Sequence, residues 1–119
     1  MITPRVRFPG LPAAVVLSLL VSACAINAPT PSSQIAASGG SGINYDEYAC
    51  PRLKTEMESL VRREFVLIAA QEQRVKSSSF QATVLGVGQG DGAEATELAN
   101  VRGDENTVHK LMQAKKCDQ

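Results

Sequence analysis

The sequence contains little of what nucleic-acid recognition or catalysis needs. It has no tryptophan, one histidine, and twelve basic residues balanced by twelve acidic ones. The basic residues form no patch, which excludes nucleic-acid binding. His109 lacks the partners of a catalytic base and would lie about 12 Å from Cys117 along a helix, too far to share a metal. We expect it to pair with Glu105 on the surface, and we predict no enzyme, no metal site and no cofactor.

Apolar runs long enough to cross a membrane are also missing. The longest run occupies residues 11–21, about eleven residues where a spanning helix needs roughly 20. Arg5 and Arg7 precede it, and small residues close it. A basic start, a short apolar run and a small-residue end are the three parts of a secretory signal peptide. We predict that residues 1–23 form this signal and are removed.

The signal ends in Val21-Ser22-Ala23-Cys24, which resembles the bacterial lipobox. In proteins with this motif, the cysteine sulfur receives a diacylglycerol, the leader is cut before the cysteine, and the new amino group is acylated. The resemblance implies that Cys24 is lipidated and that several acyl chains hold the protein to a membrane, which one chain alone does only weakly. Ala25 is not the aspartate that usually retains such proteins in the inner membrane. The expected location is the periplasmic leaflet of the outer membrane.

Cleavage after Ala25 is the alternative, because Ala23-Cys24-Ala25 also fits the small-x-small pattern of ordinary signal peptidase. The cysteine would then be discarded, and the product would be a free periplasmic or secreted protein.

The cysteine count agrees with either fate of Cys24. Three cysteines are present, and an odd number in an exported protein needs an explanation. Lipidation or removal of Cys24 leaves Cys50 and Cys117. An oxidising compartment favours a disulfide between them.

Residues 24–44 are predicted to be a flexible linker. They are rich in Ser, Ala, Gly and Pro, carry no charge, and show neither a helical nor a strand period; this composition is typical of a tether. As a random coil the segment would span roughly 20–25 Å and hold residues 45–119, the folded domain, away from the lipid surface.

The folded domain has the pattern of two helices joined by glycines. Apolar residues recur at spacings of three and four over residues 51–77 and again over 92–115, the spacing of amphipathic helices. Pro51 suits a first helical turn, and Asp91 is a candidate N-cap of the second helix. Gly103 would weaken that helix by about 1 kcal/mol. We predict an all-α, antiparallel two-helix hairpin.

An antiparallel hairpin would bring Cys50, at the start of the first helix, to Cys117, at the end of the second. A disulfide there would close the open end and contribute about 4 kcal/mol in the chain-entropy model. Tyr45 and Tyr48 are expected to pack across this end.

One stretch of the first helix, Phe65-Val66-Leu67-Ile68, is apolar on every side. One facing helix can cover only part of such a surface, and a helix that is apolar all round is normally buried all round. We expect these residues to form an interaction surface for a second copy, a membrane or an envelope protein, and a homodimer forming a four-helix bundle is favoured. The alternative is that long polar side chains cover them: Arg62, Arg63 and Gln71.

The glycine-rich residues 86–92 do not fit a phosphate-binding loop. A Walker loop needs Lys-Ser or Lys-Thr after its last glycine, whereas Ala93-Glu94 follow here. A dinucleotide fingerprint needs a preceding strand in a βαβ unit, which a chain of this size cannot supply. We predict a connecting loop.

Short motifs along the whole chain resemble one group of proteins. They are the lipobox ending at Cys24, Tyr45 and Tyr48 before Cys50-Pro51, Ala70-Gln71, Gly90-Asp91-Gly92, Glu97-Leu98-Ala99 and Lys116-Cys117. The pattern is similar to small alphaproteobacterial lipoproteins that have no established activity, so the resemblance implies an architecture and no mechanism. The expected function is that of a membrane-anchored structural or interaction component of the envelope. The alternatives are an enzyme or accessory subunit acting on envelope polymers, or a non-lipidated periplasmic protein.

Overall fold

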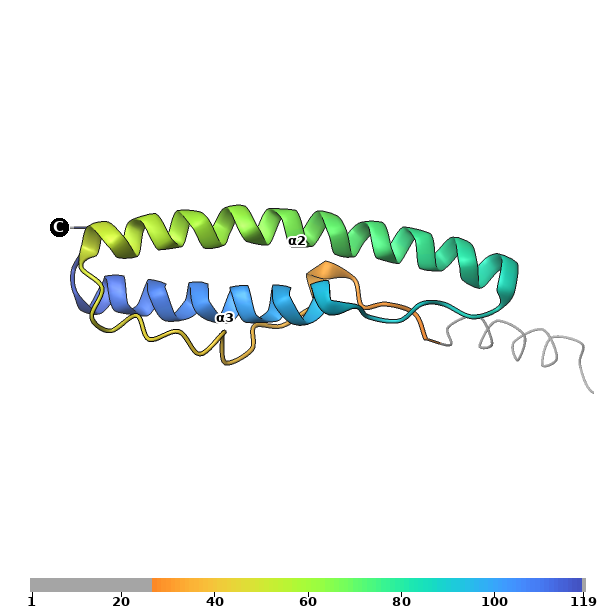
Figure 1. The fold of residues 1–119 in the computed structure, drawn as a ribbon, viewed down its shortest axis with the longest axis horizontal. Coiled ribbons are helices and arrows are strands. Elements are labelled where there is room, and N and C mark those ends of the chain that lie inside the picture. The colour runs from red at the N-terminus through yellow and green to blue at the C-terminus, as the bar shows by residue number, and fades with distance from the viewer. Residues whose placement is uncertain (1–26, 119) are drawn as a thin grey trace, which may run out of the picture.

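The computed structural model describes residues 27–118, which form an all-helical hairpin (Figure 1). Within this range a 3₁₀ turn, η2 (Ser32–Gln34), precedes two long helices, α2 (Cys50–Leu85) and α3 (Ala93–Ala114). The two helices run antiparallel and pack along most of the length of α3. The predicted all-α two-helix hairpin is confirmed. Within the described range, neither helix is both long and apolar enough to cross a membrane.

Helix α2 begins and ends where local chemistry dictates. Pro51 lies in its first turn, where a missing N–H costs no hydrogen bond. Gly86 closes it in the left-handed region, at φ 78°, and its N–H donates to the carbonyl of Ala82 at 2.9 Å. The helix therefore runs to Leu85 and not, as predicted, only to residue 77. Its 36 residues give a length of about 54 Å.

Three serines, Ser77 to Ser79, lie where the predicted helix ends, and their hydroxyls show how the helix continues through them. The Ser77 hydroxyl donates to the carbonyl of Arg74 at 3.1 Å, and that of Ser79 donates to the carbonyl of Val75 at 2.8 Å. The Ser78 hydroxyl accepts the N–H of Gln89, across the loop, at 2.9 Å. Each side chain thus finds a partner without breaking a helical hydrogen bond.

The apolar core lies between the helices and is richest toward the disulfide end. Leu53, Leu60 and Leu67 recur every seven residues, two turns apart, and therefore share one face of α2. All three are buried. The buried residues of α3 that belong to the same cluster are Leu98, Val101 and Val108.

Toward the glycine loop the interior becomes polar. Gln71 is fully buried and Ser78 nearly so. Asp91 is not the N-cap of α3, as was predicted, because Gly92 occupies that position and no side chain caps the helix. The Asp91 carboxylate instead accepts hydrogen bonds from the backbone N–H of Thr30, at 2.6 Å, and from its hydroxyl, at 2.7 Å.

Residues 27–49 lie along the hairpin, chiefly beside α3, and we call them the N-terminal strap (Figure 1). The Ser38 N–H donates to the Ala99 carbonyl at 2.9 Å, and the Ser41 N–H and hydroxyl donate to Asp104 at 2.9 and 2.6 Å. The prediction of a free linker is therefore wrong for residues 27–44. Small residues bring the strap backbone close to the helices, so its N–H groups and hydroxyls reach helix carboxylates and carbonyls. Composition alone predicts flexibility for these residues and does not show this packing.

Candidate interaction surfaces

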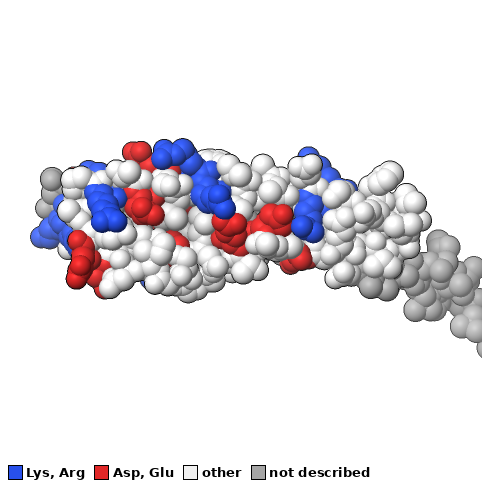
Figure 2. Space-filling model, viewed as in Figure 1, with Lys and Arg blue, Asp and Glu red and all other residues white. Residues whose placement is uncertain are grey.

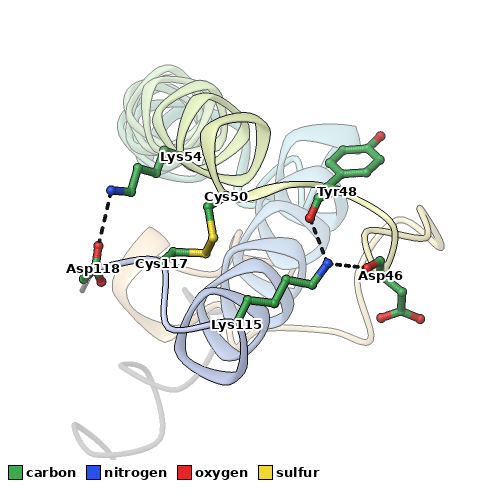
Figure 3. Close-up of a disulfide and its surroundings, with 7 residues drawn as sticks. All are labelled: Asp46, Tyr48, Cys50, Lys54, Lys115, Cys117 and Asp118. Carbon is green, nitrogen blue, oxygen red and sulfur yellow. Dashed lines mark hydrogen bonds and ion pairs between the residues drawn. A yellow bond between two sulfur atoms is a disulfide. The ribbon is translucent and has the colours of Figure 1, made fainter.

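The predicted site residues fall in three places. Cys24, the predicted lipidation site, lies outside the described residues. Cys50 and Cys117 are joined as a disulfide at the end of the hairpin, with their Cα atoms 5.3 Å apart (Figure 3). Phe65 and Val66 lie on the outside of α2, whereas Leu67 is buried and Ile68 is half-buried against the core.

The disulfide end is tightly closed. The Lys115 ammonium donates to the backbone carbonyls of Asp46 and Tyr48 (Figure 3). Tyr45 is buried and meets Tyr48 edge-to-face, with ring centroids 5.4 Å apart; the two tyrosines pack across this end as predicted. Burial also raises the pKa of Tyr45. The strap, the start of α2 and the end of α3 are thus fixed together at one point.

The first exposed apolar surface lies midway along α2, and we call it the shaft patch: Val61, Phe65 and Val66. Their side chains are 36, 68 and 63% exposed. Val61 and Phe65 lie one turn apart on the helix. The shaft patch contains only half of the predicted four-residue interaction surface, because the core takes Leu67 and most of Ile68.

The long polar side chains predicted as an alternative cover are engaged elsewhere. Arg63 donates through Nε to Glu97 of α3 at 2.9 Å. Gln71 is inside the hairpin, and Arg62 pairs with Glu58, 3.8 Å away and one turn back. Phe65 and Val66 therefore remain open to solvent.

The second exposed apolar surface is the end of the hairpin opposite the disulfide, residues 77–90, which we call the tip. It contains no Asp, Glu, Lys or Arg, and Figure 2 shows this end without charge on the visible face. Its exposed apolar side chains are Phe80 (72%), Val84 (64%), Leu85 (73%) and Val87 (53%).

The tip is not among the sequence-based predictions, which end the first helix at residue 77, place a connecting loop at residues 86–92 and assign no role to the residues between them. The uncharged run from residue 77 to residue 90 was the available signal.

The strap begins at the tip. The Gly90 N–H donates to the Asn27 carbonyl at 2.8 Å, and the Asn27 amide donates to the Gly88 carbonyl at 3.3 Å. A Cβ on Gly88 would lie 2.7 Å from the Asn27 carbonyl oxygen, so the strap and the glycine loop touch backbone to backbone.

The Gln71 amide and two carboxylates, those of Asp91 and Glu72, bind the next residues of the strap. The Gln71 amide donates to the Thr30 carbonyl at 2.7 Å and to Asp91 at 3.0 Å. Hydrogen bonds from the Thr30 hydroxyl and N–H lower the pKa of Asp91. Those from Ser32 likewise lower the pKa of Glu72.

A charged cluster crosses the middle of the hairpin. Arg102 of α3 donates through Nε to Glu64 of α2 at 2.7 Å, and through Nη1 to the strap carbonyls of both Ser32 and Ile35. Glu105 lies in the same region, and burial and the nearby Glu64 charge raise its pKa. This arrangement joins three chain segments and is structural in character.

His109 does not pair with Glu105 as expected. Its Nε2 lies 3.1 Å from the Gln113 amide on the exposed side of α3. The residues the structure describes contain no group of three or more potential metal ligands and enclose no detectable pocket.

Searches against protein-family models, curated proteins and solved structures found no match to this chain.

Proposed function

We propose that this protein is a lipid-anchored structural or interaction component of the bacterial envelope, held through acyl chains on Cys24 and acting by binding through its hairpin. The shaft patch is the observation that carries the binding role. Helix α2 carries six basic and four acidic residues, yet it exposes a phenylalanine and a valine side by side at 68 and 63%. Burying such side chains is worth about 1.5–3 kcal/mol each.

The partner that fits this patch best is a second copy of the chain. Two hairpins meeting along α2 would form a four-helix arrangement, which is a common way for paired helices to bury an outer apolar face. A two-fold contact needs one surface to be complementary to itself. Arg62 and Glu58, exposed and of opposite sign on the same helix, can pair across such an axis.

The membrane anchor supports the same proposal. The signal-like start and the lipobox would place every copy on one surface, which raises the local concentration and favours association between copies. Two readouts on the full chain, produced in a bacterium, test the anchor and the association separately.

Radiolabelled palmitate tests the anchor. The wild-type chain is expected to incorporate label, and the Cys24→Ala variant is expected to incorporate none. Equal labelling of both chains, or of neither, would contradict lipidation at Cys24.

Photo-crosslinking in intact membranes tests the association. A photoreactive amino acid replacing Phe65 is expected to give a product of twice the chain's mass that contains both of two differently tagged copies. The same amino acid replacing Asn106, exposed on α3, serves as the control and is expected to give none. A product at position 65 with only one tag would point to a different protein, and no product would remove the binding role of the shaft patch.

A further inference from the structure

The position of Asn27 determines where a lipid on Cys24 can be. Asn27 is bonded to Gly88 and Gly90 at the tip, and Cys24 precedes it by three residues. Three residues span at most about 11 Å even when fully extended. The acyl chains proposed for Cys24 therefore join the chain within about 11 Å of Asn27 and of the tip, far from the disulfide end.

The surface at the tip is suited to a lipid interface. Its four exposed apolar side chains are as open to solvent as those of the shaft patch. The nearest charges along the chain are Lys76 and Asp91, which bound the uncharged run. Lys76 lies about 13 Å along the helix from Leu85, so the tip can enter a less polar medium without carrying a charge into it.

Several polar side chains of the tip are satisfied by the backbone of α2 itself. The Thr83 hydroxyl donates to the Ser79 carbonyl at 2.9 Å, and the hydroxyls of Ser77 and Ser79 donate to carbonyls one turn earlier. Hydroxyls bonded back to their own helix lose less when water is removed. Moving this part of α2 out of water therefore costs less than it would if these hydroxyls were bonded only to water.

The depth of the apolar surface also fits. Phe80 and Leu85 are five residues apart, about 7.5 Å along the helix axis. Apolar faces of interfacial helices sink roughly 5–10 Å into the boundary between headgroups and acyl chains. A hairpin that meets the bilayer end-on would bury the tip and leave the shaft patch in water.

We propose that the tip docks on the lipid bilayer that holds the acyl chains of Cys24, so that the hairpin stands upright with its disulfide end away from the membrane. This inference rests on the proposed lipidation of Cys24. The strap makes the anchor short, because it fixes Asn27 against Gly88 and Gly90 instead of letting residues 27–49 act as a spacer.

Fluorescence quenching by lipid tests the orientation. The lipidated full chain carrying Val87→Cys, or Gln113→Cys near the disulfide end, is labelled without reductant with an environment-sensitive fluorophore. It is then reconstituted into vesicles of phosphatidylethanolamine and phosphatidylglycerol that contain a lipid spin-labelled near its headgroup. We expect the probe at position 87 to be quenched at least twofold more than the probe at position 113.

Serine substitutions provide the matched control. Val84→Ser with Leu85→Ser is expected to reduce the quenching at position 87, although the acyl chains still hold the tip near the bilayer. Phe65→Ser with Val66→Ser removes a comparably exposed apolar pair and is expected to leave that quenching unchanged. Circular dichroism of each variant checks that the helices remain folded.

The outcomes separate this inference from the proposed function. A chain that floats with the vesicles but shows no quenching at position 87 would overturn docking and leave the anchor intact. Equal quenching at positions 87 and 113 would mean that the hairpin lies flat. Blue-shifted emission at position 87 that lipid leaves unquenched would mean that a protein, a second copy included, covers the tip, which also overturns docking. A chain that does not float overturns both the anchor and this inference.

Discussion

Single polar residues hold the strap on the hairpin. The fully buried Gln71 bonds both to the strap, at Thr30, and to Asp91 of the glycine loop. Hydrogen bonds from Thr30 lower the pKa of Asp91, so the folded state favours the ionised carboxylate. Stability from this contact is present above the ordinary pKa of an aspartate and is lost as the pH falls through the lower, folded value.

Glu105 behaves in the opposite way. Burial and the neighbouring charge of Glu64 raise its pKa, and Arg102 only partly offsets them. One of its carboxylate oxygens is buried without a partner among the described residues. A raised pKa means that the folded state binds the proton more tightly than the unfolded state. Stability from this residue is therefore fullest below about pH 4.5, its ordinary pKa, and is lost as the pH rises through the raised, folded pKa.

Glu105→Gln should consequently raise the temperature of unfolding at pH 7, because it removes a charge that the fold disfavours. The gain should shrink toward pH 4, where the wild-type carboxyl is largely protonated. Thermal unfolding followed by circular dichroism at both pH values measures this. Glu58→Gln, at an exposed position, should change little at either pH, and a Glu105→Gln gain that is equal at the two pH values would contradict the assignment.

At the scale of elements, hydrophobic periodicity predicted the two helices and their antiparallel pairing, because Leu53, Leu60 and Leu67 record one buried face of α2. Periodicity could not place the end of α2, because it does not show that Ser77 and Ser79 bond their hydroxyls back to the helix, which then continues past them to Leu85. It also could not show that the strap packs, because Ser, Gly and Ala are equally common in flexible linkers and in segments that approach a helix closely. The tip was missed because the end of α2 could not be placed, and the packing of the strap was missed because its composition also fits a flexible linker.

Gly103 shows how close that approach is. A Cβ at this position would lie 2.5 Å from the Gly40 nitrogen and 2.8 Å from its Cα, and would also contact the Ser38 carbonyl oxygen. These are backbone atoms that cannot rotate away. The glycine predicted as a weak point in α3 is the place where the strap and the helix touch.

Gly103→Ala should therefore destabilise the protein by about 1–3 kcal/mol, the usual cost of overpacking, although alanine alone would strengthen a helix by about 1 kcal/mol. Hydrogen exchange at the Ser38 amide, bonded to the Ala99 carbonyl, should become faster as the strap is displaced. Gly39→Ala is the control, since a Cβ at Gly39 meets nothing within 4 Å. A more stable Gly103→Ala protein would show that the strap yields easily.

At the scale of the whole molecule, the two ends of the hairpin differ in chemistry. One end is covalently closed and carries charged residues such as Lys54 and Asp118, which lie 3.7 Å apart. The other end is uncharged and apolar. Between them, the described chain has a narrow core of two helices and a strap, so the clamp accounts for a large part of the stability of such a small unit.

Reduction of the disulfide, or Cys50→Ser with Cys117→Ser, should lower the free energy of unfolding by about 4 kcal/mol, because the bond closes a loop with a sequence separation of 67 residues and restricts the unfolded chain. Urea unfolding with and without reductant measures the difference. The double serine variant should be insensitive to reductant, and a wild-type change below about 1 kcal/mol would contradict the clamp.

The course of the strap also determines how the protein responds to force. Tension applied from the N-terminal side reaches the Asn27–Gly90 hydrogen bond first and then each following contact of the strap in turn. The contacts should therefore break one after another and not all at once. Residues 27–49, once detached, would add roughly 80 Å of extended chain before the tension reached Cys50. There the disulfide would pass the tension directly to the end of α3 and spare the helices. The strap is in this sense a stored length of tether that pulling releases in small steps.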